Sequence, residues 1–135
     1  MKVVYDNYGN KAVKVQYKDP LTGVTKDANI SYDSRGLPIF DDHAKYITKI
    51  DTSVSYRRQM SQATKDLRDA INAGKISTES FTPTQLKQIK AGSGQIDGYT
   101  WHHNAQSSPN NMQLIPEDVH NAALHIGQGS LSGGK

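Results

Sequence analysis

Four of the five histidines in this 135-residue chain lie within 24 consecutive residues, and they constrain its fold more than any other feature. Residues 99–103 are predicted to form a short strand that ends on two adjacent histidines, and residues 112–115 to form a second strand. A helix is expected to begin at residues 116–118 and to end near His125, because Gly127 is a natural helix stop. This β-β-α order places a strand end beside a helix face, where four imidazoles can converge.

These imidazoles make the unit a candidate metal centre. Neutral imidazole binds Zn²⁺ and other transition metals, whereas cysteine, the usual alternative for Zn²⁺, is absent from the chain. Since adjacent residues on a strand point to opposite faces, His102 and His103 are expected to take different roles. His120 and His125 lie about 140° apart on an ideal helix, so both can reach one ion only if the helix is distorted or ends near His125.

A metal beside a free histidine suits phosphodiester cleavage. The reaction needs a nucleophile, a group that stabilises charge and an acid for the departing oxygen. One metal can neutralise the phosphate and departing oxygens, and one neutral histidine can deprotonate water. Taken singly, each histidine is as easily structural, whereas the four together favour a site. Trp101 is expected to anchor the core of the unit, and His43 to be structural or incidental.

The whole chain predicts one α+β domain, residues 1–135. Its parts are a β-rich antiparallel meander at residues 1–44, a helical part at 45–92, the ββα unit at 98–127 and a flexible tail at 128–135. In the meander, alternating apolar residues and turn-rich tetrapeptides predict strands at residues 2–5, 12–17 and 28–32, followed by an extended apolar segment at 37–40.

The helical part predicts two helices. Apolar residues recur at steps of three and four, which predicts a helix over residues 53–73, capped by Thr52 or Ser53 and stopped by Gly74. Its apolar stripe consists of Tyr56, Met60, Ala63, Leu67 and Ala70. A shorter helix begins at residues 82–83, with Thr as the cap and Pro in the first position, and ends at Gly92.

Positive charge gathers in the same helical part. The net charge is +3, and nine Lys and Arg face four Asp and Glu within residues 45–90. A basic surface suits a polyanion such as nucleic acid, although charge alone is explained as well by a solvated helix face. The candidate phosphate contacts are Arg57, Arg58, Lys65 and Arg68. No apolar run is long enough to span a membrane and no signal peptide is visible, but such a chain could be the released end of a larger secreted protein.

Residues 98–129 resemble the WHH branch of the HNH (His-Me finger) nucleases. The resemblance rests on Trp-His-His, then Met-Gln-Leu-Ile-Pro, then His-x₄-His-x-Gly. Residues 32–40, Tyr-Asp-Ser-Arg-Gly-Leu-Pro-Ile-Phe, resemble a segment that lies upstream in the same toxins. The family supplies C-terminal toxin domains of bacterial polymorphic, contact-dependent toxin systems, and the His-His pair is similar to the Leu-His-His of colicin DNases.

The resemblance implies a metal-dependent endonuclease that is delivered as part of a larger toxin and cleaves DNA in the target-cell cytoplasm. It makes His102 a metal ligand, His103 the general base, and His120 and His125 the residues that complete the site of one divalent ion, Zn²⁺, Ni²⁺ or Mg²⁺. The place of the middle Asn of HNH motifs falls to Asn111 or Gln113. A cognate immunity protein with an acidic face is the implied partner.

Three alternatives remain open at this point. An RNase could share the same fold, because nothing in the motif contacts the sugar. A non-catalytic metal finger could bind nucleic acid through a closed, four-coordinate ion. A zinc hydrolase of peptides or carbohydrates is disfavoured, because no Glu accompanies the histidine pair as in HExxH enzymes.

Overall fold

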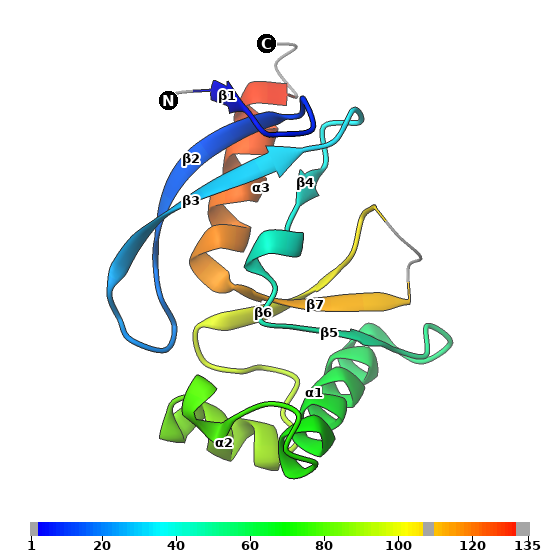
Figure 1. The fold of residues 1–135 in the computed structure, drawn as a ribbon. Coiled ribbons are helices and arrows are strands. Elements are labelled where there is room, and N and C mark those ends of the chain that lie inside the picture. Colours follow the sequence, from blue (N-terminus) through cyan, green and yellow to red (C-terminus); the bar gives the residue numbers. More distant parts are fainter. Residues whose placement is uncertain (1–2, 107–109, 132–135) are drawn as a thin grey trace.

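The computed structural model describes residues 3–106 and 110–131, and within them the side chains of residues 4–106 and 110–124. It confirms an α+β fold with two antiparallel sheets (Figure 1). The first sheet has the order β1-β2-β3-β4, which are Val3–Tyr5, Lys11–Lys18, Thr25–Tyr32 and Pro38–Ile39. The second has the order β5-β7-β6, which are Tyr46–Lys49, Asn111–Pro116 and Tyr99–His103. The helices are α1 (Tyr56–Asn72), α2 (Pro83–Lys90) and α3 (Glu117–Leu131), with 3₁₀ turns η1 (Asp41–His43) and η2 (Thr78–Ser80).

The predicted meander is confirmed, and α3 lies against it (Figure 1). Val13 pairs with Ile30 in register, and both are buried. This apolar face packs on Val119 and Ala123 of α3. The hydroxyl of Tyr32 also donates to the Ala123 carbonyl at 3.0 Å. The helix that follows the histidine strands is therefore fixed by the first forty residues of the chain.

Strand β5 was not predicted, because residues 45–92 were expected to be helical. It pairs with β7 from Tyr46↔Leu114 to Lys49↔Asn111 and turns the two histidine strands into a three-stranded sheet. Its alternation is short: Ile47 is exposed and Thr48 is buried. Four residues are too few for a periodic signal to stand out, and the partner strand lies more than sixty residues away.

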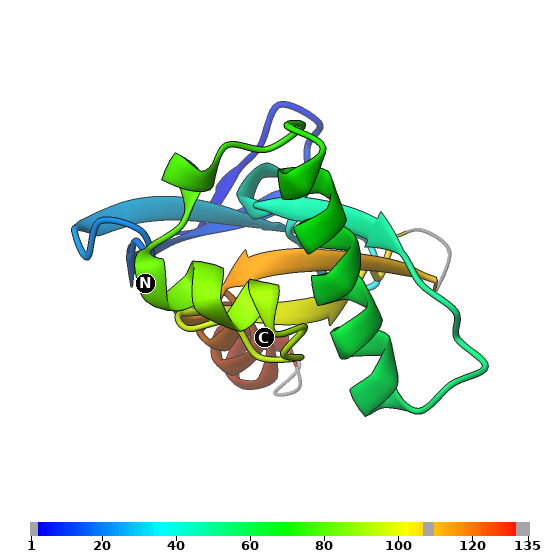
Figure 2. The same cartoon turned by 90° about the horizontal axis from the view of Figure 1, so that it is seen from below.

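The second sheet lies between two hydrophobic cores. Met112 and Leu114 point to the core shared with α1 and α2, which also contains Trp101. Ile115 points the other way, into the core shared with α3 and the first sheet. Figure 2 shows α1 and α2 on one side of this sheet and α3 on the other. Trp101 is buried, and its indole N–H donates to the Thr64 hydroxyl at 3.0 Å, so its predicted role as a core anchor is confirmed.

Helix α1 begins three residues later than predicted. Its cap is Ser55, whose hydroxyl accepts from the Arg58 backbone at 3.3 Å, and not Thr52 or Ser53. The predicted stop is confirmed: Gly74 has a φ of +75° and its N–H donates to the Ile71 carbonyl. The predicted start and stop of α2 are also confirmed, with a capping box at its start and a positive φ at Gly92.

The predicted end of the last helix is wrong. Helix α3 continues through His125 and Gly127 to Leu131 and so includes residues 128–131 of the expected tail, and residues 132–135 lie outside the described part. A glycine costs a helix interior only about 1 kcal/mol, and the preceding turns are held against the first sheet. The early helix end that could have brought His120 and His125 to one ion is therefore absent. Across residues 3–106 and 110–131, no helix is long and apolar enough to cross a membrane.

Candidate active site

The adjacent histidines at the end of β6 diverge, as predicted for neighbours on a strand. The ring of His102 points toward α3, with its centroid 5.2 Å from the ring of His120 and 4.8 Å from that of Phe40. The ring of His103 points toward α1, where its Nε2 lies 2.7 Å from Oε1 of Gln59. The sheet therefore separates His102 and His120 on one face from His103 on the other. The expected convergence of the four imidazoles is wrong for His103, and the described rings that do meet are those of His102 and His120.

His102 and His120 have the chemistry of metal ligands. The Nε2 atom of His102 is buried and has no hydrogen-bond partner within the described structure. Burial, and then the nearby His120 and His103, lower the pKa of His102 to about 4. Burial also lowers the pKa of His120, against the raising effects of Asn121 and Glu117. Both rings are thus neutral near pH 7, and a neutral ring nitrogen without a partner is what a transition metal binds.

Gln113 adds a second unsatisfied atom to this face. It pairs with His102 across the strands and is fully buried. Its Nε2 donates to Oδ1 of Asp41 at 2.8 Å, which leaves its Oε1 buried and without a partner in the described part of the chain. Unpaired buried polar atoms are costly. Two of them on neighbouring residues mark a place where a polar ligand fits.

The described donors account for part of a metal site. No three His, Cys, Asp or Glu side chains in the part that the structure describes are close enough to hold an ion. His102 and His120 supply two nitrogen ligands, and the amide oxygen of Gln113 is a further donor. The side chain of His125 lies outside the described residues, so its predicted part in the site is neither supported nor opposed. His43 instead bonds through Nε2 to the Asn29 carbonyl at 3.0 Å, away from this group.

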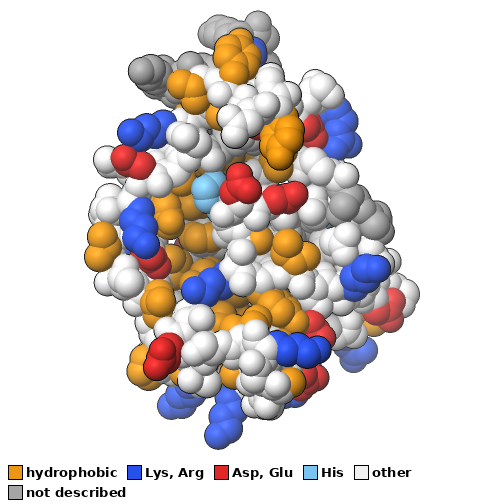
Figure 3. All heavy atoms as spheres, in the orientation of Figure 1, with side chains coloured by type: hydrophobic (Ala, Val, Ile, Leu, Met, Phe, Trp, Pro, Cys, Tyr) orange, Lys and Arg blue, Asp and Glu red, His pale blue; other side chains and the backbone are white. Residues whose placement is uncertain are grey.

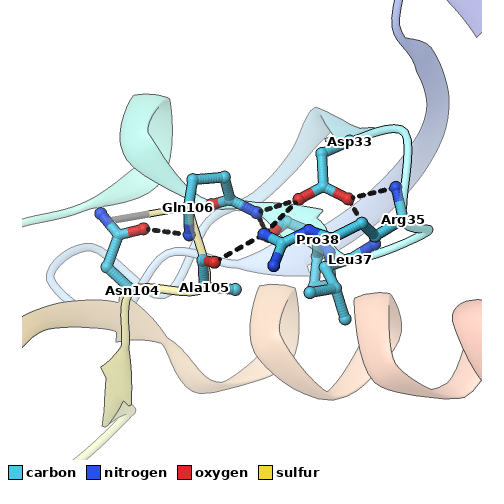
Figure 4. Close-up of polar contacts among 7 residues, drawn as sticks. All are labelled: Asp33, Arg35, Leu37, Pro38, Asn104, Ala105 and Gln106. Carbon is cyan, nitrogen blue, oxygen red and sulfur yellow. Dashed lines mark hydrogen bonds and ion pairs between the residues drawn. The ribbon is translucent and has the colours of Figure 1, made fainter. Parts of the chain in front are cut away.

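The loop after β6 is held by the segment at residues 32–40 (Figure 4). Oδ2 of Asp33 accepts from the guanidinium of Arg35 at 3.0 Å and from the amide of Gln106 at 3.1 Å. The same guanidinium donates to the Ala105 carbonyl at 2.7 Å, and Gln106 also donates to the Pro38 carbonyl. Burial acts to raise the pKa of Asp33, but the hydrogen bonds it accepts bring that pKa down to about 2. We call these contacts the Asp33 clamp.

The four candidate phosphate contacts are not equivalent. Arg57 and Arg58 are exposed and line a groove of about 510 Å³ with residues 60, 61 and 93–95. Lys65 is also exposed, whereas the guanidinium of Arg68 donates to the Lys90 carbonyl at 3.1 Å and so holds the end of α2. The face seen in Figure 3 has hydrophobic side chains in a hollow and acidic ones beside a histidine, with Lys and Arg scattered rather than gathered.

The two candidates for the middle Asn lie on the same face of β7. Gln113 is opposite His102, as described above. Asn111 begins the strand, pairs with Lys49 of β5, and its carbonyl accepts from the Asn104 backbone at 2.9 Å, which closes the loop between β6 and β7. Of the two candidates, Gln113 is therefore the residue that lies opposite His102 in the sheet.

Phe40 and Gln59 contact the histidines and were missed in the sequence. Gln59 is buried in the first turn of α1. The predicted apolar stripe instead placed Tyr56 on the buried face of this turn, but Tyr56 is 52% exposed. Its position four residues before Ala63 puts it on the apolar face, and a polar residue there is a signal for a buried hydrogen bond. Phe40 was placed in an apolar segment, but nothing local shows that it packs on His102 and His120.

The family model for the DNase/tRNase domain of colicin-like bacteriocins matches residues 30–127. The match begins in β3 and ends within α3, so it spans the Asp33 clamp and every candidate histidine, and it covers well over half of the chain. The chain therefore belongs to this family and is a nuclease toxin domain of the bacteriocin type. No curated protein and no solved structure matches the chain.

Proposed function

We propose that this domain is a metal-dependent endonuclease of the WHH type that hydrolyses phosphodiester bonds in target-cell DNA. The observation that carries the proposal is the pair of partly buried rings of His102 and His120, 5.2 Å apart, with the buried Nε2 of His102 unpartnered within the described structure. In a family of nuclease domains, such a pair suits a divalent ion better than it suits packing, because packing leaves a buried nitrogen unsatisfied.

In this proposal His102 and His120 hold one ion, and Gln113, rather than Asn111, orients the strand pair. His125 would complete the ligand set through a distortion of α3, because the helix does not end near it. When bound, the ion would neutralise charge on the phosphate and the departing oxygen. Imidazole ligands favour Zn²⁺ or Ni²⁺ over Mg²⁺, which prefers oxygen. Three protein ligands would leave open positions for substrate, as in catalytic sites.

His103 serves as the general base in the same proposal. It belongs to the strand that carries His102 but lies on the other face, so it remains free to take a proton from water. Arg57 and Arg58 bind the phosphate backbone. They follow Tyr56, whose ring lies 5.1 Å from that of His103.

The domain travels as part of a larger toxin, acts in the target-cell cytoplasm, and is neutralised in the producer by an immunity protein with an acidic face.

RNA is a second candidate substrate, because the family's description covers tRNases as well as DNases. The two share the phosphodiester chemistry, and none of the residues described here selects the sugar. Parallel digestion of plasmid DNA and tRNA separates them. Faster cleavage of tRNA at equal enzyme concentration would replace DNA by RNA in the proposal.

The central test is digestion of supercoiled plasmid with a chelator and after adding Mg²⁺, Mn²⁺, Ni²⁺ or Zn²⁺ separately. We expect no cutting with the chelator and recovery with at least one ion. His103→Ala should fold, bind metal and lose cutting by at least about a hundredfold, the usual contribution of a general base. His43→Ala is the matched control and should cut normally. Cutting by His103→Ala at the parental rate would remove the proposed base.

The same experiment addresses a non-catalytic metal finger. That alternative predicts a metal-loaded protein that binds nucleic acid and cuts neither DNA nor RNA with any of the four ions. Such a result would oppose the nuclease proposal.

A further inference from the structure

We propose that Gln59 is a positioning residue that fixes the tautomer of His103, so that the ring carries its proton on Nε2 and presents Nδ1 to water. The proposal rests on the proposed role of His103 as the base. It concerns which of the two ring nitrogens is available, since a neutral imidazole has one donor and one acceptor nitrogen.

The orientation of the Gln59 amide is set by the backbone. Its Nε2 lies 3.0 Å from the Val54 carbonyl and 3.5 Å from the Thr52 carbonyl, and carbonyl oxygens only accept hydrogen bonds. Turning the amide over would place its oxygen against the Val54 carbonyl and lose that bond. The amide nitrogen therefore faces the loop before α1, and the amide oxygen faces His103.

The amide oxygen in turn dictates the proton on His103. Oε1 lies 2.7 Å from Nε2 of the ring, a distance for a hydrogen bond. Because an amide oxygen cannot donate, Nε2 of His103 must carry the proton, which leaves the lone pair on Nδ1. Gln59 is only 8% exposed, so water does not readily replace it as the partner.

A second contact keeps the ring in place. The ring of Tyr56 packs against the ring of His103. The two ring centroids are 5.1 Å apart, and the angle between the ring planes is 58°. Both contacts come from the first turn of α1, whereas His103 comes from the end of β6. The loop before α1, through the Val54 carbonyl, thus controls which nitrogen of a residue on another element can accept a proton. An orienting group behind the base is a common requirement of proton-transfer sites.

The direct test is a long-range ¹H–¹⁵N correlation spectrum of the histidine rings, recorded on the parent protein at a pH where His103 is neutral. His103→Ala assigns the signals. We expect a protonated Nε2 and an unprotonated Nδ1. In Gln59→Leu the ring loses its acceptor, so the nitrogen shifts should move toward the average of two tautomers. Gln59→Glu keeps an acceptor for Nε2 of His103 but gives up the bond to the Val54 carbonyl, so the proton should stay on Nε2 at a pH where the ring is neutral.

Activity supplies a second readout. Gln59→Leu should lower kcat on plasmid by at least about tenfold with little change in KM, as for a group that acts on the chemical step. Gln59→Glu, which keeps only the contact with the ring, should recover part of kcat, and Gln62→Leu, on an exposed residue of the same helix, should be parental. Urea unfolding followed by Trp101 fluorescence shows whether each variant is folded.

The outcomes separate this inference from the proposed function. A parental spectrum with the proton on Nδ1 overturns the inference whether or not the protein cuts DNA, and so does a folded Gln59→Leu with parental tautomer and kcat. If Nε2 is protonated but His103→Ala cuts normally, the inference about the tautomer is supported and the proposed role of His103 as the base is wrong. If Gln59→Leu does not fold, the spectra of the parent and of Gln59→Glu still test whether Nε2 of His103 carries the proton.

Discussion

Single residues determine what each face of the second sheet can do. His102 faces His120 with a buried, unpartnered nitrogen, and His103 faces Gln59. A shift of one residue in the register of β6 would exchange these environments, because neighbours on a strand alternate. The pairing of His102 with Gln113 is therefore as important for the site as the identity of the histidines.

We expect metal to stabilise the parent protein through His102 and His120. At a concentration about 100 times the Kd, Ni²⁺ should add about 2.7 kcal/mol to the free energy of unfolding. His102→Ala and His120→Ala should each lose most of this gain, and His43→Ala should keep it. Thermal unfolding with and without the ion measures the effect. An undiminished metal-dependent shift in either of the first two variants would move the ion to another site.

At the scale of elements, α1 serves both the core and the surface. Its buried face includes Ala63 and Leu67. In its first turn, Gln59 contacts His103, and the exposed residues Arg57 and Arg58 line the groove. The charged pair therefore lies on the same turn that contacts the candidate base.

Replacing Arg57 and Arg58 together by Ala should weaken DNA binding without unfolding the protein, because both side chains are exposed. If each contacts one phosphate, the slope of log K against log salt should fall by about 2. Titration of a labelled duplex at several salt concentrations gives the slope. Lys75→Ala, beyond the far end of α1, is the control, and an equal loss in that variant would mean that binding is not localised.

The Asp33 clamp should make stability depend on pH. The pKa of Asp33 is about 2 in the folded protein, below its usual value of 3.8. A carboxyl with a lowered folded pKa stabilises the fold fully above its unfolded pKa and loses that contribution as pH falls through the folded one. The contribution of Asp33 should thus be constant above about pH 5 and decline between about pH 4 and pH 2.

Asp33→Asn tests this expectation. The difference in unfolding free energy between parent and variant should narrow as pH falls from about 4 to 2. Asp27→Asn, on an exposed residue of the same sheet, serves as control. Urea unfolding at each pH gives the values. A difference that stays constant across this range would show that the clamp does not favour the ionised carboxyl.

At the scale of the whole molecule, the two cores share one thin sheet and should unfold together. Ile115 belongs to the core with α3, whereas Trp101 reports on the core with α1 and α2. Ile115→Ala should cost about 2–5 kcal/mol. Trp101 fluorescence and far-UV circular dichroism should both report the lower midpoint, and Leu124→Ala, on the exposed side of α3, should change little. Separate midpoints for the two signals would mean that the cores unfold independently.

Local signals sufficed for much of this architecture. Turn residues and alternation identified the meander, and Thr82, Gly74 and Gly92 marked helix ends, because caps and turns depend on neighbours in sequence. Pairing over long separations was not accessible in the same way. Strand β5 and the packing of Phe40 on the histidines depend on partners more than sixty residues away. The local stop signal at Gly127 was likewise misleading, because the preceding turns of α3 are held on the first sheet through Val119 and Ala123.

The division of the histidines between two faces has a consequence for how the toxin is handled in the cell. A chain that is still being synthesised or translocated has neither α1 nor α3 packed on the second sheet. Loss of the α1 layer frees the ring of His103, and loss of the α3 layer removes His120 from His102. In the proposed mechanism, each incomplete state lacks either the oriented base or the pair of metal ligands, so cutting requires both α1 and α3 to be packed on the sheet.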